Sequence, residues 1–221
     1  MAPSDPKSET QVDRPDRQSA LSHRSPLTGD DGLIMREATH LGKLVLRLAA
    51  TEAETVEFDA LEGAALPTQP CNSSVSDTGT VSVLWLGPDE WMIVSQAGTE
   101  QALQTRLQSD VSGRHFQLSN VTDYYTCIDI AGDQNREILM NLSTLDMHKR
   151  SFSAGQIKGS IFGHANAYVW QLHTDPGASE TFRLIVRSSM ADYLWCLISR
   201  SARLFGMPED TPSSGEKLVI S

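Results

Sequence analysis

Cysteine is scarce in this 221-residue chain, and Cys71, Cys127 and Cys196 are widely spaced. No CxxC pair occurs, which leaves a zinc ribbon or a thioredoxin-type site without support. Separated thiols in odd number are typical of a reducing compartment. We therefore expect a cytoplasmic protein with free cysteines.

Positive charge is also in short supply. The chain has 18 Lys and Arg against 28 Asp and Glu, a formal net charge of −10. Nucleic acids and anionic membrane surfaces need clustered Lys and Arg, so neither is an expected partner. No apolar run reaches the ~20 residues that span a bilayer. The polar first seventeen residues lack the apolar stretch of a secretory signal.

The usual catalytic signatures are missing. The sequence has no GxGxxG fingerprint, no GxxxxGK[ST] phosphate loop, no GxSxG elbow and no HExxH. The 6 His are scattered without ligand spacing. Asp146 and His148 could form an acid/base pair, but nothing beside them supplies a nucleophile or an oxyanion hole. We expect no catalytic, cofactor-binding or metal-binding residue in this chain.

Both ends of the chain have a composition that predicts little ordered structure. The first residues, to about position 18, mix Pro, Ser, Asp and Lys without periodicity, whereas 19–27 is less polar. We therefore predict three parts. The first is a disordered tail over 1–32 that includes a candidate partner-binding arm, and the last is a loose tail over 207–221. Between them lies a folded domain over 33–206, which would divide near 110–125 if it forms two small lobes.

A strand and a hairpin stand out in the first half of the domain. Residues 40–49 alternate, with three leucines on one face and Lys43 and Arg47 on the other, as in a half-buried strand. Residues 81–86 and 91–94 are strands joined by the turn Gly-Pro-Asp-Glu. Trp85 and Trp91 would then lie almost opposite each other and stabilise the hairpin.

Helices and strands alternate through the rest of the chain. We predict helices over 99–109 (capped by Thr99), after Gly132-Asp133, and from Ser189 to Leu204. We predict strands over 127–131, 165–172 and 182–187, and in the last of these apolar residues alternate with Arg183 and Arg187. This order favours an α+β fold with antiparallel or mixed sheets and packed helices.

The last predicted helix has an unusually wide apolar arc. Tyr193 and Trp195 flank the face formed by its aliphatic residues, which leaves a narrow polar strip. Such a helix is either wedged into its own core or lies at a subunit interface. Because Trp is enriched at interfaces, we take four aromatic residues as candidate interface positions: Trp85, Trp91, Tyr193 and Trp195.

Several strings, in this order, resemble one family. They are LWLGPDEWMI (84–93), IDIAG (128–132), REIL (136–139), LDMH (145–148), FSAG (152–155) and FRLIVRSSMADYLW (182–195). The set resembles the gamma subunit of bacterial heterotetrameric sarcosine oxidase, and the resemblance covers roughly residues 19–205.

The resemblance implies a fold related to the folate-binding aminomethyltransferases of the glycine cleavage system. It implies a complex with alpha, beta and delta subunits that oxidatively demethylates sarcosine to glycine, in sarcosine catabolism and one-carbon metabolism. Oxygen becomes hydrogen peroxide, and the one-carbon unit leaves as formaldehyde or methylene-tetrahydrofolate. FAD, FMN, NAD, zinc and tetrahydrofolate are expected on other chains, and this chain is expected to be a non-catalytic accessory subunit.

Two alternatives belong to other functional classes. A free-standing folate-binding protein of the same fold would carry a Lys-Gly-Cys-Tyr type motif, but the comparable stretch 153–160 reads SAGQIKGS and lacks the cysteine. A small hydrolase would rest only on scattered Ser and His. Folate titration and an esterase assay of the isolated chain would test them.

Overall fold

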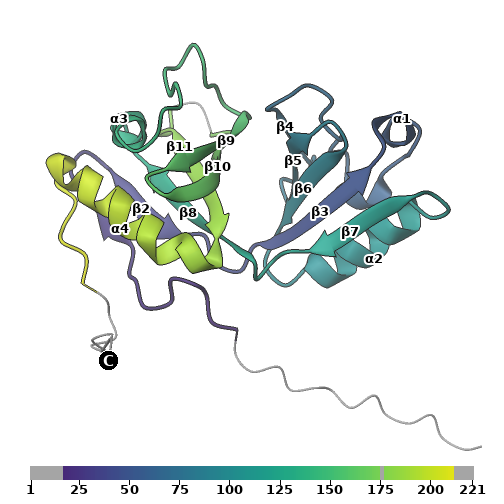
Figure 1. Cartoon of the computed structure of the whole chain (residues 1–221), viewed down its shortest axis with the longest axis horizontal. Coiled ribbons are helices and arrows are strands. Elements are labelled where there is room, and N and C mark those ends of the chain that lie inside the picture. The colour runs from purple at the N-terminus through teal and green to yellow at the C-terminus, as the bar shows by residue number, and fades with distance from the viewer. Residues whose placement is uncertain (1–16, 175–176, 212–221) are drawn as a thin grey trace, which may run out of the picture.

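The chain folds into two antiparallel sheets that pack face to face, each with helices on its outer face. The computed structural model describes residues 17–174 and 177–211. Almost all of the predicted disordered stretch over 1–18, and most of the loose C-terminal tail, therefore lie outside the described residues. Figure 1 shows one sheet with α3 and α4 on the left and the other with α1 and α2 on the right.

Sheet A is built from both ends of the chain. Its strand order is β1-β2-β8-β11-β10-β9, and all neighbours are antiparallel. The strands are β1 (Leu27–Thr28), β2 (Ile34–Glu37), β8 (Tyr125–Ala131), β9 (Ile157–Phe162), β10 (Ala165–Gln171) and β11 (Thr181–Arg187).

Sheet B is formed by one continuous stretch between β2 and β8. Its order is β4-β5-β6-β3-β7, again antiparallel throughout. The strands are β3 (Gly42–Leu48), β4 (Ser73–Val75), β5 (Val81–Gly87), β6 (Glu90–Ser95) and β7 (Phe116–Asn120).

The helices cover the outer faces of the sheets. On sheet A lie α3 (Asn135–Met140) and α4 (Ala191–Ser201), with the 3₁₀ turns η2 (Ser188–Met190) and η3 (Ala202–Phe205). On sheet B lie α1 (Ala50–Ala53), η1 (Asp59–Leu61) and α2 (Glu100–Asp110). We call each sheet with its helices the A-lobe and the B-lobe. The predicted α+β class with antiparallel sheets and packed helices is confirmed.

A third apolar cluster joins the two sheets. It combines B-lobe residues (Leu84, Met92, Val94) with A-lobe residues (Cys127, Ile157, Trp170, Ile185), all of them buried. Polar contacts close one corner of this seam. Trp170 Nε1 donates to Ser73 Oγ at 3.1 Å, and the backbone N–H of Ile157 donates to the carbonyl of Cys71. The described part of the molecule is therefore one packed unit.

The predicted tryptophan hairpin is confirmed. Trp85 on β5 and Trp91 on β6 are directly paired, and the register shifts between Trp85 and Gly87 at the turn. The local pairing of two strands joined by a short turn is the kind of contact that a sequence pattern specifies well.

The exposed position predicted for Lys43 is wrong, and Arg183 is covered as well. Lys43 is 2 % exposed and Arg183 is ion-paired with Asp129, because these faces of β3 and β11 are covered by the opposite sheet. The single-sided burial pattern of one strand cannot reveal a second sheet. Burial lowers the pKa of the Lys43 ammonium, and its Nζ donates to the carbonyl of Leu41 at 2.6 Å.

Several predicted helix boundaries also need correction. The N-cap position, directly before the first helical residue, is occupied by Gln134 in α3 and by Met190 in α4, rather than by Asp133 and Ser189. Thr99 does precede α2, but its hydroxyl donates to Gln96 O instead of accepting a helix N–H. Helix α4 ends at Ser201, where the tighter turn η3 begins, so it stops short of the predicted end.

The segment predicted as a candidate arm contacts this chain itself. Leu21 and Leu27 are buried in the core of the A-lobe. Arg24 donates to Asp192 on α4 at 2.8 Å and to Asp210 near the C-terminal end of the described chain at 2.6 Å. Both ends of the described chain are thus fixed on α4.

Candidate functional site

A cavity of about 590 Å³ opens on the outer face of the B-lobe. It lies between α1, the loop that follows η1 and the β5–β6 turn, beside the apolar core that α2 covers. Its walls are nearly all apolar or small: Ala50, Ala53, Glu54, Val56, Phe58, Gly63, Ala64, Ala65, Leu66, Thr68, Pro70, Trp85, Pro88 and Trp91.

Two of the four candidate interface residues meet at this cavity. Trp91 is 2 % exposed, and its indole Nε1 donates to the carbonyl of Pro67 at 2.9 Å, which fixes the loop against β6. Trp85, its partner across the hairpin, is half-buried and forms a wall of the cavity. The hairpin therefore supplies one rigid aromatic side of the site.

The other walls were missed by the sequence analysis. Val56, Phe58 and Leu66 lie in a stretch without helix or strand periodicity, which gives no reason to group them. The one local signal is that Val56 and Phe58 enclose the exposed Glu57. These residues meet the hairpin only through the tertiary fold.

The cavity is apolar inside and acidic at its edge. Glu54 is the only ionisable side chain among the lining residues, and both Glu54 and Glu57 are exposed. Asp89, next to the lining Pro88, lies 4.0 Å from Arg47, so its charge is partly balanced. Arg114 donates to Thr55 Oγ1 at 2.9 Å, which places one positive charge near the two glutamates. A bound group would therefore bury apolar surface and meet an excess of negative charge at the rim.

The two other candidate interface residues lie on α4 in the A-lobe. Trp195 is 1 % exposed, and its Nε1 donates to Asp210 Oδ2 at 2.7 Å. Tyr193 is half-buried, and its hydroxyl accepts the backbone N–H of His164 at 3.1 Å. The structure thus does not bring all four residues to one place, and Trp195 serves the chain's own core. A partner contact at Tyr193 stays a prediction.

Asp146 and His148, considered above as an acid/base pair, lie in a turn held by local hydrogen bonds. Asp146 accepts the Ser151 hydroxyl at 2.6 Å and the backbone N–H of His148 at 2.9 Å. These two hydrogen bonds hold the pKa of Asp146 below its usual range. The imidazole Nδ1 of His148 accepts the backbone N–H of Arg150 at 3.2 Å, so this nitrogen is engaged within the same turn.

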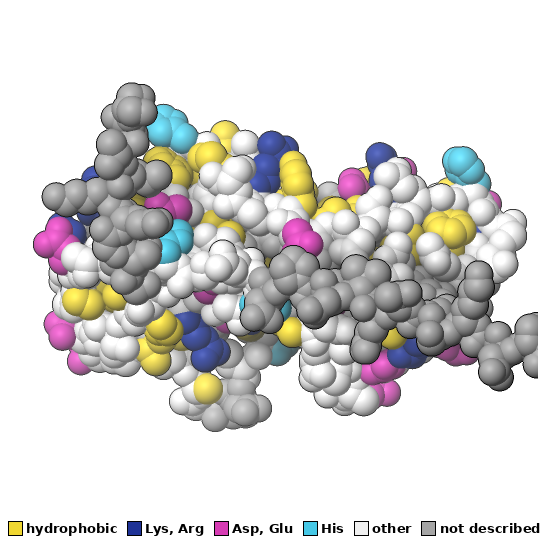
Figure 2. Space-filling view, turned by 90° about the horizontal axis from the view of Figure 1, so that it is seen from below, with side chains coloured by type: hydrophobic (Ala, Val, Ile, Leu, Met, Phe, Trp, Pro, Cys, Tyr) yellow, Lys and Arg dark blue, Asp and Glu magenta, His cyan; other side chains and the backbone are white. Residues whose placement is uncertain are grey.

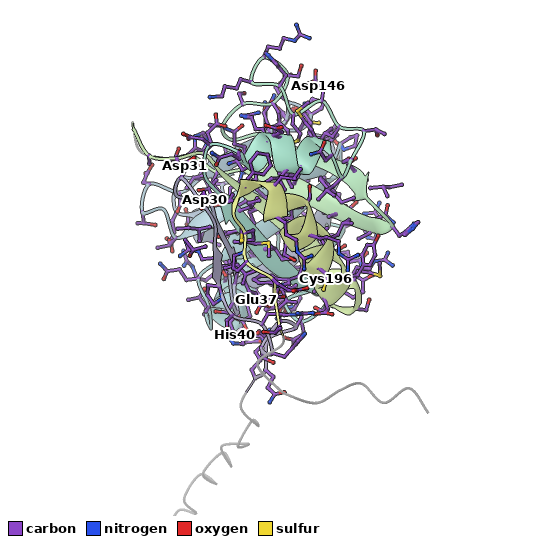
Figure 3. The ribbon with its side chains drawn as sticks, turned by 90° about the vertical axis from the view of Figure 1, so that its left-hand side faces the viewer. Asp30, Asp31, Glu37, His40, Asp146 and Cys196 are labelled. Atoms are coloured by element: carbon purple, nitrogen blue, oxygen red, sulfur yellow. The ribbon has the colours of Figure 1, made fainter. Side chains whose placement is uncertain are left out.

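A second group of ionisable side chains meets at α4, where Arg24 donates to Asp192, Asp210 and Cys196 Sγ and His23 contacts Asp192. Figure 3 shows Asp146 at the outer end of the A-lobe, well away from Cys196 on α4 and from Glu37 and His40. Within 17–174 and 177–211, no group of three His, Cys, Asp or Glu could hold a metal ion. Burial raises the pKa of the Cys127 and Cys196 thiols, which disfavours the nucleophilic thiolate.

The described surface and helices also show no feature typical of binding to nucleic acid or of crossing a membrane. On the described part of the face in Figure 2, Lys and Arg are scattered among other residues and form no broad basic area. None of the helices in the described ranges is long and apolar enough to cross a bilayer.

Comparison of the sequence with known proteins finds one family and two curated relatives. Residues 51–203 match the model of the "Sarcosine oxidase, gamma subunit family". The sarcosine oxidase subunit gamma of Corynebacterium sp. (strain U-96) is 20 % identical over 79 % of this chain and 82 % of the relative. That of Arthrobacter sp is 22 % identical over 63 % of this chain and 67 % of the relative.

Solved structures show the same fold. A chain of the heterotetrameric sarcosine oxidase from Corynebacterium sp. U-96 matches with a TM-score of 0.72 at 20 % identity, over 91 % of this chain and 98 % of that one. The glycine cleavage system aminomethyltransferase T from Bartonella henselae matches with a TM-score of 0.56 at 15 % identity, over 83 % of this chain and 48 % of that one. With the family model spanning more than half of its length, this chain belongs to the sarcosine oxidase gamma subunit family.

Proposed function

We propose that this chain is a non-catalytic accessory subunit of a heterotetrameric sarcosine oxidase. The observation that carries the proposal is the family match over residues 51–203. The two gamma-subunit relatives, which match over most of their own length, also support it. Its partners would be the alpha, beta and delta subunits.

The assembled complex would oxidatively demethylate sarcosine to glycine. Sarcosine loses two electrons to O2, which becomes hydrogen peroxide, and water or tetrahydrofolate takes the one-carbon unit as formaldehyde or methylene-tetrahydrofolate. FAD, FMN, NAD, zinc and tetrahydrofolate would be held by the other chains. The role of this chain is to bind and orient its partners through a preformed surface.

The architecture suits such a role. Each sheet has helices on one face and part of the other sheet on the opposite face, and apolar packing and hydrogen bonds hold the seam between them. A rigid subunit loses little conformational entropy on assembly, so more of the contact energy stabilises the complex. The three cysteines are unpaired, which supports a cytoplasmic location.

Co-expression provides the test. A tagged copy of this chain, produced with the alpha, beta and delta subunits, is expected to co-purify with them in equal amounts. The eluate should show flavin absorbance and sarcosine-dependent peroxide formation, and the chain produced alone should be colourless and inert.

The control for this experiment is the same preparation without this chain. A lower yield or lower stability of the remaining complex would support the accessory role. A chain that elutes alone, without flavin, contradicts the proposal. If that free chain also binds tetrahydrofolate in a titration, the folate-binding alternative replaces it.

A further inference from the structure

We propose that the B-lobe cavity receives an apolar side chain, flanked by Lys or Arg, from another subunit of the complex. This inference rests on the proposed function and adds which surface of the chain is used and what kind of segment occupies it. It follows from the lining of the cavity, the charge at its edge and the rigidity of its walls.

The lining selects an apolar group over a small polar metabolite. Pockets for metabolites combine apolar walls with a few polar groups that orient the ligand. Here the indole N–H of Trp91 is already used by Pro67 O, and the other polar side-chain groups of the lining are those of Thr68, the exposed Glu54 and the indole N–H of Trp85. An aromatic or aliphatic side chain needs no such partner and gains from every apolar contact.

The edge of the cavity selects basic neighbours for that side chain. Glu54 and Glu57 are exposed beside the lining residues Val56 and Phe58 and outnumber the one nearby cation, Arg114, which donates to Thr55 Oγ1. The chain as a whole carries a net charge of −10. Charged groups at the rim of an interface contribute mainly to partner choice and association rate. A segment with Lys or Arg next to its apolar anchor would complement this rim, whereas a second copy of this acidic chain would be repelled.

The walls are fixed before binding. Trp91 holds the loop through Pro67 O, and the backbone N–H of Ala60 donates to Asp110 Oδ2 at 3.0 Å, which ties η1 to the end of α2. Energetically dominant interface residues fill such preformed pockets and are surrounded by contacts that exclude water. The occupant therefore needs no rearrangement of this subunit.

Filling the cavity provides the first test. Ala53→Trp, on the half-buried side of α1, is expected to weaken binding to the purified complex of alpha, beta and delta subunits at least ~10-fold. Binding is measured by surface plasmon resonance with the full chain. Ala50→Trp, at an exposed lining position, serves as a second variant if Ala53→Trp does not fold.

Ala102→Trp is the matched control, because Ala102 is exposed on α2 of the same lobe and does not line the cavity. It should bind like the natural chain. Melting temperatures of all variants separate a binding effect from unfolding.

Reversing the rim charge provides the second test. The double variant Glu54→Lys/Glu57→Lys is expected to associate about 3- to 10-fold more slowly at low salt and to lose most of its salt dependence. Asp133→Lys, an exposed position in the A-lobe, is the control and should leave the rate nearly unchanged.

The outcomes separate this inference from the proposed function. If the natural chain does not bind the other subunits, the proposed function fails. If the natural chain binds and both tryptophan variants bind equally well, the proposed function stands and the cavity is not the docking site. If the natural chain elutes as a dimer that Ala53→Trp dissociates, the occupant is a second copy, and the inference is overturned.

Discussion

Replacing Asp129 by alanine is expected to lower the free energy of unfolding by about 3–5 kcal/mol. Arg183 Nε and Nη2 donate to the two carboxylate oxygens of Asp129 at 2.7 and 2.8 Å. Both side chains lie on the face of sheet A that packs against sheet B, and Asp129 is buried. Removing the carboxylate leaves the guanidinium buried without its counter-charge. Urea denaturation followed by circular dichroism measures the loss.

The double variant Asp129→Leu/Arg183→Leu separates the cost of an unpaired charge from the value of the pair. Since replacing a buried ion pair by apolar residues is often neutral or stabilising, the double variant should recover most of the lost stability. If it is as unstable as Asp129→Ala, the pair itself holds the seam, and the explanation by an unpaired charge is wrong.

Trp195→Ala is expected to destabilise the chain by a similar amount, about 3–5 kcal/mol. The indole is almost fully buried between α4 and sheet A, and its N–H donates to Asp210, which also binds Arg24. The variant creates a large cavity in the A-lobe core and removes the hydrogen bond that helps to hold Asp210 beside Arg24. Thermal and urea unfolding measure the change.

Trp195→Phe is the conservative control for this position. It keeps most of the apolar volume and loses the hydrogen bond to a carboxylate, which contributes about 1.5–3 kcal/mol. A Trp195→Ala variant as stable as the natural chain would contradict the observed burial. A Trp195→Phe variant that stays folded but no longer binds the other subunits would instead place Trp195 at an interface.

Local patterns predicted the parts of the fold that depend on neighbours in the chain. The Trp85–Trp91 pairing follows from two strands and a short turn, and it is observed. Strands β7 and β9 were missed, because β7 is only five residues long, with two apolar residues, and β9 contains Gly159 in its middle. Their existence depends on pairing with β3 and β10, which a single-strand pattern does not encode.

The candidate site was predictable only in part for the same reason. The tryptophan hairpin was identified, but the stretch from Val56 to Leu66 that closes the cavity has no periodicity of its own. The burial of Lys43 and Arg183 was not predicted, because the second sheet that covers them is remote in sequence. What could not be predicted is therefore the set of contacts made across long sequence separations.

The split origin of sheet A has a consequence for the newly made protein. The B-lobe sheet spans residues 42–120 without interruption, whereas β2 pairs only with β1 and β8. Sheet B therefore emerges complete from the ribosome before β8 and the strands that follow it, and domains commonly fold in the order in which they emerge.

During that interval, Met35 on β2 and the seam residues Leu84 and Met92 of sheet B have no cover, although all three are fully buried in the finished chain. Apolar strands that are exposed and unpaired promote aggregation. The nascent chain thus presents a holding chaperone with a defined target, which disappears once β8 to β11 have been translated.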